Sequence, residues 1–190
     1  MSPFCSRAAD FSLAAGLTAG AWTVLYQVNT WWFTALEWAD GVSWIFLPAA
    51  VRLLAVLLFG SAGALGLFVG GFVTMSMVEE APWPKSLCVA AVSSLAPLMA
   101  VGLMLRRLRL PSNLRGIGTR HLVLLALVSA AVSGLLHNFC YWIIGQRVDP
   151  LSGLLPMFAG DLAGTLVVLY LARSALRLHR LVGRAHGTDR

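Results

Sequence analysis

The feature that most constrains this sequence is a dense block of arginines set between long apolar segments. Residues 106–120 contain five of them: Arg106, Arg107, Arg109, Arg115 and Arg120. Apolar segments of about 20 residues cross a bilayer, whereas short loops rich in Arg and Lys stay on its cytoplasmic side. The pattern predicts an integral membrane protein in which residues 106–120 form a basic cytoplasmic loop.

Composition supports this class and accounts for the charge. Of the 190 residues, 58% are hydrophobic and 12% are charged, and the mean hydropathy is +0.79. A soluble domain would have about 25% charged residues. The formal net charge of +6 would suggest nucleic acid as the partner of a soluble protein. Here the arginines of residues 106–120 lie where anionic lipids of the inner leaflet bind them, so we expect lipid and no nucleic acid.

Six apolar segments are long enough, or nearly so, to cross about 30 Å of hydrocarbon as helices. They comprise residues 11–33, 42–59, 61–78, 86–105, 121–145 and 154–176. We therefore expect an all-α integral membrane protein with six transmembrane helices in a single domain, residues 1–190. Pro48 and Pro97 fall inside two of these segments, and we expect each to kink its helix.

Arginine positions also predict the orientation. On the six-span reading, Arg7, the loop at 106–120 and the tail at 177–190 lie on one side of the bilayer, and only Lys85 and Arg147 are basic on the other. Both termini are then cytoplasmic, and residues 177–190 form a basic cytoplasmic tail. We expect a multi-pass protein of a bacterial inner membrane.

Tryptophans gather at the outer ends of the predicted spans. Six of the seven are expected there: Trp31, Trp32, Trp38, Trp44, Trp83 and Trp142. Indole rings prefer the membrane interface, where one edge is wet and the body is apolar. The asymmetry exceeds what anchoring requires and suggests an aromatic rim around an outward-facing mouth.

Three ionisable residues fall in the outer halves of the predicted spans, where a buried charge is costly and marks a functional hypothesis. Helical rise places Arg52 about 13 Å and Asp161 about 7 Å below the outer surface, and His137 lies near the end of its span. One interpretation is a pocket open to the periplasm in which Arg52 binds an anionic group. Its expected ligand-binding residues are Arg52, Asp161, His137, Asn138 and Trp44. The other interpretation is an Arg52–Asp161 ion pair that joins two helices without any ligand.

Small residues recur at helical spacing in the first span. Ala15 and Ala19 form one pair and Gly16 and Gly20 another, and small residues let helix backbones approach closely. These four residues predict either packing within the bundle or a face that docks another membrane protein.

Signals for catalysis and for metals are weak. The sequence contains no phosphate-binding Gly-rich loop, H-E-x-x-H or Gly-x-Ser-x-Gly motif, so we expect no enzyme and no cofactor. Cys5, Cys88 and Cys140 have no metal-ligand spacing, and we expect no metal site. Cys88 and Cys140 both fall near the outer face. We expect two free buried thiols there, with a disulfide as the alternative.

Two stretches resemble a known family. Residues 44–71, WIFLPAAVRLLAVLLFGSAGALGLFVGG, resemble the N-terminal helical hairpin of bacterial membrane-associated sensor domains. Residues 158–170, FAGDLAGTLVVLY, resemble the Gly-Asp-x-x-Gly closing helix of the same domains. The resemblance implies a six-helix sensor domain, here expected without the kinase or cyclic-dinucleotide effector that usually follows it.

A second family is similar in its layout. The length, six spans and cytoplasmic termini resemble the substrate-binding S components of energy-coupling-factor transporters. Their first helix carries an Ala-x-x-x-Ala motif that docks the coupling subunit, and Ala15 and Ala19 match it. Both resemblances imply a compact bundle that binds something from outside. Our hypothesis is a module for small-molecule binding, sensing or substrate capture in a larger membrane assembly, and the alternative is a structural subunit or assembly factor without a ligand.

Overall fold

The computed structural model describes residues 3–39, 42–108, 116–146, 149 and 151–187. In this part of the chain the fold is a bundle of helices with one short β-hairpin. Its elements are α1 (Pro3–Phe33), a 3-10 turn η1 (Thr34–Leu36), β1 (Glu37–Ala39), β2 (Val42–Ser43), α2 (Pro48–Phe59), α3 (Ser61–Val73), a π-helical turn η2 (Thr74–Val78), α4 (Trp83–Arg107), α5 (Thr119–Ile143) and α6 (Leu154–Gly187). The predicted helical class is confirmed.

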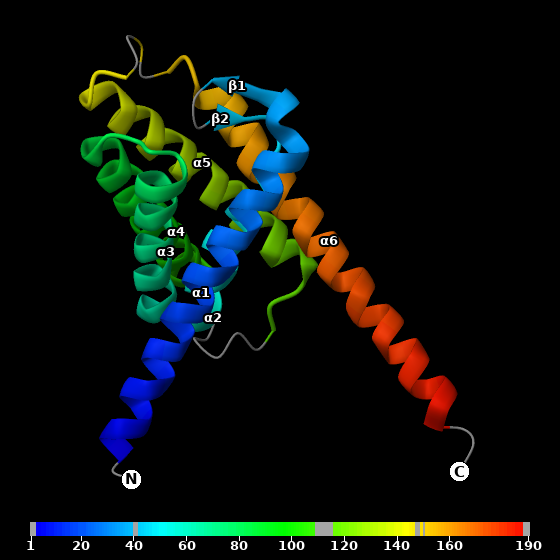
Figure 1. Ribbon diagram of the computed structural model, residues 1–190. Coiled ribbons are helices and arrows are strands. Elements are labelled where there is room, and N and C mark those ends of the chain that lie inside the picture. Colours follow the sequence, from blue (N-terminus) through cyan, green and yellow to red (C-terminus); the bar gives the residue numbers. More distant parts are fainter. Residues whose placement is uncertain (1–2, 40–41, 109–115, 147–148, 150, 188–190) are drawn as a thin grey trace.

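The helices run alternately in opposite directions, so that the start of α1 and the end of α6 lie at one end of the bundle, the terminus end (Figure 1). The antiparallel strands β1 and β2 lie at the other, the hairpin end. Four helices, α1, α4, α5 and α6, are long and apolar enough to cross a membrane. Large apolar side chains such as Leu13, Leu17 and Val24 of α1 point outward and are 63%, 59% and 64% exposed. The chain is therefore a multi-pass membrane protein.

Helix α2 is short and central. It has 12 residues, about 18 Å of helix, and it contacts each of the other five helices. The expected span at 42–59 is therefore wrong in its first third: residues 42–43 form β2, and residues 44–47 continue without helix to Pro48. Pro48 does not kink a helix but begins one, because the first helical position needs no backbone N–H.

The turn between α2 and α3 is the tight break expected at Gly60. This residue adopts φ 56°, a backbone conformation that side chains with a Cβ rarely take. Gly63, one turn later, lies so close to the Ala55 carbonyl that a Cβ atom would overlap it. Because residue 63 has no Cβ, α2 and α3 pack in direct backbone contact next to the turn.

Helices α1 and α3 meet through small residues. A Cβ atom on Gly66 would overlap the Ala15 carbonyl, and one on Gly70 would lie 3.1 Å from the Ala19 Cα atom. Ala15 and Ala19 therefore pack within the bundle, as one of the two interpretations held. Gly16 and Gly20 lie on the exposed side of α1, where a Cβ atom would meet nothing within 4 Å.

A disulfide joins the start of α4 to the end of α5. Cys88 and Cys140 are bonded, with their Cα atoms 6.3 Å apart. The expectation of two free thiols is therefore wrong. Both cysteines were placed at the same level, but only the packing of α4 directly against α5 brings them to bonding distance.

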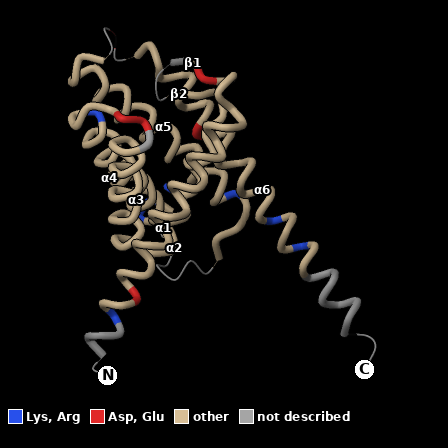
Figure 2. Tube along the Cα trace, in the orientation of Figure 1, with Lys and Arg blue, Asp and Glu red and all other residues tan. Residues whose placement is uncertain are grey.

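Most charges separate along the bundle, with Asp10 at the terminus end and Lys85 at the hairpin end as exceptions (Figure 2). Glu37, Glu79 and Glu80 belong to β1 and to the connection before α4, at the hairpin end. The exposed Arg106, Arg107 and Arg120 flank the connection between α4 and α5 at the terminus end. Arg109 and Arg115 of the predicted basic loop, and Arg147 and Asp40 of the predicted outer loops, lie outside the described residues. The predicted basic tail begins inside α6, which continues to Gly187.

Candidate functional site: a buried ion pair beneath a cavity

The centre of the site is an ion pair between α2 and α6. The two terminal nitrogens of Arg52 face the two carboxylate oxygens of Asp161, and each pair of atoms is 3.1 Å apart. Both side chains are about 95% buried, with exposed fractions of 5% and 4%. This is the bidentate geometry in which guanidinium and carboxylate interact most strongly. The ion pair that one interpretation of the sequence held is therefore present.

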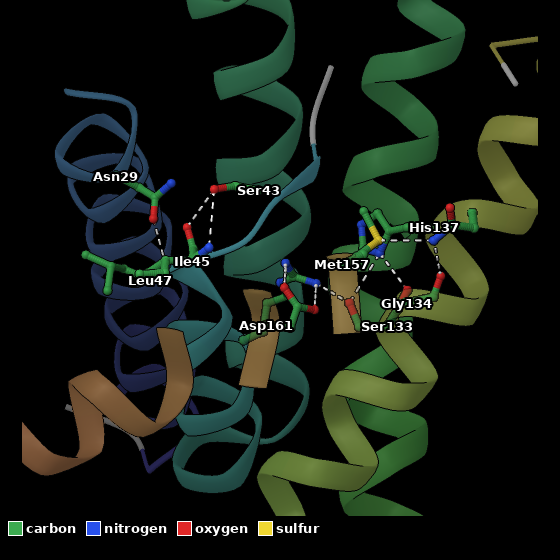
Figure 3. A network of polar contacts seen from close by, with 11 residues as sticks. Asn29, Ser43, Ile45, Leu47, Ser133, Gly134, His137, Met157 and Asp161 are labelled. Atoms are coloured by element: carbon green, nitrogen blue, oxygen red, sulfur yellow. Dashed lines mark hydrogen bonds and ion pairs between the residues drawn. The ribbon is translucent and has the colours of Figure 1, made fainter. Parts of the chain in front are cut away.

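Helix α5 completes the polar network. Arg52 Nη1 also donates a hydrogen bond to the hydroxyl of Ser133. His137, one turn further along α5, has Nδ1 3.0 Å from the Ser133 carbonyl oxygen and 3.3 Å from its hydroxyl. Figure 3 shows Asp161, Ser133 and His137 in one connected network. The Arg52 guanidinium therefore connects its own helix, α2, to α5 and α6.

Two aromatic rings support the Arg52 side chain. Its guanidinium carbon lies 5.0 Å from the centre of the Phe46 ring and 5.5 Å from that of Trp22. Contacts of this length between a cation and an aromatic face are attractive, and more so where water is excluded. Tyr26 packs against both rings and extends this aromatic wall along α1.

Glycines on α6 allow the segment before α2 to reach the ion pair. Gly160 and Gly164 flank Asp161, and a Cβ atom on either would overlap a carbonyl oxygen of that segment, from Ser43 and Phe46 respectively. The Phe46 N–H also donates to the Gly160 carbonyl, at 3.0 Å. The Gly-Asp-x-x-Gly pattern therefore has a structural explanation. The glycines leave room for the backbone of the segment before α2, and the aspartate between them forms an ion pair with Arg52.

The residue Asn29 of α1 secures the same segment from the opposite side. Its side-chain oxygen accepts a hydrogen bond from the N–H of Leu47, at 2.8 Å (Figure 3). Leu47 directly precedes α2, and its N–H would otherwise be a buried donor without a partner. Irregular backbone at this depth in a membrane protein needs such partners.

Above the ion pair lies a cavity of about 90 Å³, enough for roughly six water molecules. Its floor includes Arg52, Asp161 and His137, and its walls include Tyr26 and Tyr141. At the other extreme the lining includes the exposed residues Thr34, Glu37 and Glu79. The cavity therefore leads from the surface at the hairpin end down to the buried charges.

Three polar atoms on residues that line the cavity have no hydrogen-bond partner among the described residues. They are Nε1 of Trp22, Nε of Arg52 and Oγ of Ser93. The three residues are buried, with exposed fractions of 1%, 4% and 0%. A buried polar atom in a native protein is almost always satisfied by protein, water or a ligand. These atoms have almost no accessible surface, however, so they belong to parts of the wall that a guest in the cavity does not reach.

The residues expected at the site divide into two groups. Arg52, Asp161 and His137 come together and line the cavity. Asn138 lies outside the lining and is buried between α5 and α6, where its amide donates to the Gly134 carbonyl at 2.7 Å and lies 3.5 Å from the Met157 sulfur. Trp44 lies at the exposed rim, 42% exposed, and is also not part of the lining.

Sequence reasoning missed Ser133, Trp22 and Ser93. For Ser133 a signal existed, because Ser129, Ser133 and His137 follow one another at intervals of four residues and form a polar stripe on α5. All three are buried. Trp22 differs from the other six tryptophans, which are all exposed, and its position in the middle of α1 was the only hint.

No grouping of three His, Cys, Asp or Glu side chains suitable for a metal ion occurs in the described part of the chain. In comparisons with protein-family models, with curated proteins and with solved structures, the chain matches none of them. The resemblances to sensor domains and to S components remain predictions.

Proposed function

We propose that this protein binds a small molecule in the cavity above the Arg52–Asp161 pair, as the binding or sensing module of a larger assembly in a bacterial inner membrane. The observation that carries the proposal is a cavity that leads from the hairpin end to three buried ionisable side chains, Arg52, Asp161 and His137. A bundle that needed only stability would gain from apolar packing at these positions.

Charge and the disulfide support one orientation in the membrane. The exposed arginines at the terminus end suit the cytoplasmic side, and the glutamates at the hairpin end suit the outer side. The Cys88–Cys140 disulfide lies toward the hairpin end, and disulfides persist in oxidising compartments such as the periplasm. In this orientation the cavity opens to the periplasm, and both termini are cytoplasmic.

One observation favours a second candidate, a structural subunit without a ligand. The terminal nitrogens of Arg52 are already held by Asp161 and Ser133, so the pair can join α2, α5 and α6 by itself. The exposed Gly16 and Gly20 on α1 would then supply a close-packed face for a protein partner.

Native mass spectrometry of the protein, extracted gently from its own membrane, distinguishes the two candidates. We expect a bound small molecule on the unmodified chain. A Ser93→Val variant should lose it, because Ser93 lines the cavity and is fully buried. The matched control is Ser94→Val, since Ser94 follows directly on α4 but bonds the Ala91 carbonyl and lies outside the lining.

An adduct that survives in Ser93→Val as well as in Ser94→Val binds elsewhere and counts against this cavity. A protein partner in constant ratio, with no small-molecule adduct, supports the structural subunit instead.

A further inference from the structure

Two buried side chains of the cavity lining each keep a polar atom that a guest can reach. They belong to Asn29 of α1 and His137 of α5, which are 6% and 3% exposed. Among the described residues, the Asn29 amide nitrogen Nδ2 and the His137 ring nitrogen Nε2 have no hydrogen-bond partner. Unlike Nε1 of Trp22 and Nε of Arg52, both atoms retain accessible surface. Since their residues line the cavity, a guest there can pair with them.

The hydrogen bond to Leu47 determines which end of the Asn29 amide is free. The Leu47 N–H can only donate, so the amide oxygen accepts it, at 2.8 Å. The amide nitrogen is then at the other end of the group, and Figure 3 shows it turned away from Leu47. An amide NH₂ group has two hydrogens to donate and does not accept. The α1 side of the cavity therefore suits an oxygen acceptor.

The contact with Ser133 determines the free nitrogen of His137 in the same way. The Ser133 carbonyl oxygen can only accept, so His137 Nδ1, 3.0 Å away, carries a hydrogen. In the neutral ring the other nitrogen, Nε2, is then an acceptor. The α5 side of the cavity therefore suits a hydrogen-bond donor, such as a hydroxyl group.

The two atoms are too far apart to share one group of a guest. Figure 3 shows Asn29 and His137 on either side of Asp161, on different helices. Other parts of the lining are apolar and include Met75, Val89 and Met157. A guest that satisfies both atoms therefore has two polar ends joined by an apolar body.

The charges of the floor favour a guest without charge. The terminal nitrogens of Arg52 and the carboxylate oxygens of Asp161 are paired with each other, so neither group is left as a counter-ion. Burying a further charge beside them costs far more than burying a hydroxyl that is hydrogen-bonded. The glutamates of the lining, Glu37 and Glu79, lie at the exposed mouth and not at the floor.

Resting on the proposed function, we propose that the ligand is a short uncharged molecule with a polar group at each end, of the diol class. One end accepts a hydrogen bond from the Asn29 amide, and the other donates one to the His137 ring. The cavity of about 90 Å³, space for roughly six waters, limits the ligand to about six non-hydrogen atoms.

Titration of the detergent-solubilised protein with four probes of similar size, followed by saturation-transfer NMR, tests this assignment. The first probe, 1,3-propanediol, has both polar ends, and butan-1-ol has one. The others, 3-aminopropan-1-ol and 3-hydroxypropionate, replace one end by a positive and a negative charge. We expect 1,3-propanediol to bind at least about fivefold more tightly than butan-1-ol, the factor that one net hydrogen bond supplies. The charged probes should bind more weakly still.

Two variants remove one end of the site each and keep its structural hydrogen bond. Asn29→Asp still accepts from the Leu47 N–H but has no amide hydrogens, and His137→Asn still has a donor for the Ser133 carbonyl but no atom in place of Nε2. Each should weaken 1,3-propanediol roughly fivefold. Butan-1-ol should change little, because its single hydroxyl can use the remaining end.

The ratio of the two affinities therefore falls toward one in either variant, whereas partial unfolding would weaken both probes alike. The matched controls are Thr23→Val on α1 and Ser129→Ala on α5, both outside the lining, and they should leave the ratio unchanged.

Several results would overturn the assignment. Equal affinities for 1,3-propanediol and butan-1-ol, or an unchanged ratio in both site variants, would show that Asn29 and His137 do not read two polar ends. Tighter binding of a charged probe would reject an uncharged ligand and leave the proposed function standing. Absence of binding by all four probes, together with a small-molecule adduct in native mass spectrometry, would reject this ligand class but not the cavity. Absence of both probe binding and adduct would reject the ligand class and the proposed function together.

Discussion

Two regions of the bundle hold their helices together by different means. At the α1–α3 interface, Gly66 and Gly70 bring two backbones into contact, and no Asp, Glu, Lys or Arg takes part in the contacts that these glycines make. Around Arg52, charged and hydroxyl side chains join α2, α5 and α6 beside a cavity. In the first region the two backbones are as close as glycine permits, whereas the second region leaves a cavity.

The difference bears on whether the Arg52 region serves stability alone. In lipid, small-residue contacts are sufficient to associate helices. A buried ion pair gives little net stability compared with apolar residues of the same volume. The Arg52 region therefore keeps a buried ion pair where apolar residues could give similar stability, as expected of a functional site.

The largest expected effect comes from breaking the ion pair on one side only. Asp161→Ala leaves the Arg52 guanidinium buried without its counter-charge, and we expect unfolding free energy to fall by about 3–5 kcal/mol. Unfolding by SDS titration in mixed micelles measures it. The double variant Arg52→Met with Asp161→Leu should recover most of the loss, and Asp10→Ala, at an exposed position of α1, should change little.

If the double variant is as unstable as Asp161→Ala, the pair is a structural requirement in its own right. The contrast between the two regions would then no longer indicate a site.

The sequence allowed the ionisable residues of the site to be placed but not their neighbours. Helical rise placed Arg52, Asp161 and His137 in the outer halves of their spans. Whether they faced one another depended on helix rotation, which the apolar pattern of a membrane helix specifies poorly because lipid and core are both apolar. For the same reason Trp22 and Ser133 were missed, and the Cys88–Cys140 pair was assigned the wrong state.

The start of α2 also could not be predicted from hydropathy. Residues 44–47 are as apolar as the helix that follows, so hydropathy could not separate the irregular segment from a span. Tertiary contacts decide the conformation of this segment: Gly160 and Gly164 leave room for its backbone, and Asn29 accepts the hydrogen bond from the Leu47 N–H. Helical class and the Gly60 turn needed no such information.

The second effect concerns the disulfide beside the cavity. It closes a sequence separation of 52 residues between α4 and α5, and we expect reduction to lower the unfolding free energy by about 2–4 kcal/mol. The same SDS titration with and without dithiothreitol measures this. A Cys88→Ser, Cys140→Ser double variant should already have the lower stability and should not respond to the reductant. A response in that variant would assign the effect to something other than this bond.

The third effect tests the small-residue region. Gly66→Ala places a Cβ atom onto the Ala15 carbonyl and 2.6 Å from the Thr18 Cβ, so α1 and α3 must separate, at a cost of about 1–3 kcal/mol. Gly16→Ala makes the same change on the exposed side of α1 and should stay within about 0.5 kcal/mol of the unmodified protein. Equal losses at both positions would show that Gly16 is packed too, against a second copy.

The smallest effect joins the two regions, because Asn29 belongs to α1 but holds the segment that precedes α2. Asn29→Ala removes the acceptor of the Leu47 N–H, and an unsatisfied buried donor would cost up to about 3 kcal/mol. Asn29 also lines the cavity, however, so water there can take over the hydrogen bond. We therefore expect a loss of only about 1 kcal/mol, with Thr30→Ala, an exposed neighbour, as the near-neutral control. A loss near the upper figure would mean that water does not reach Leu47 from the cavity.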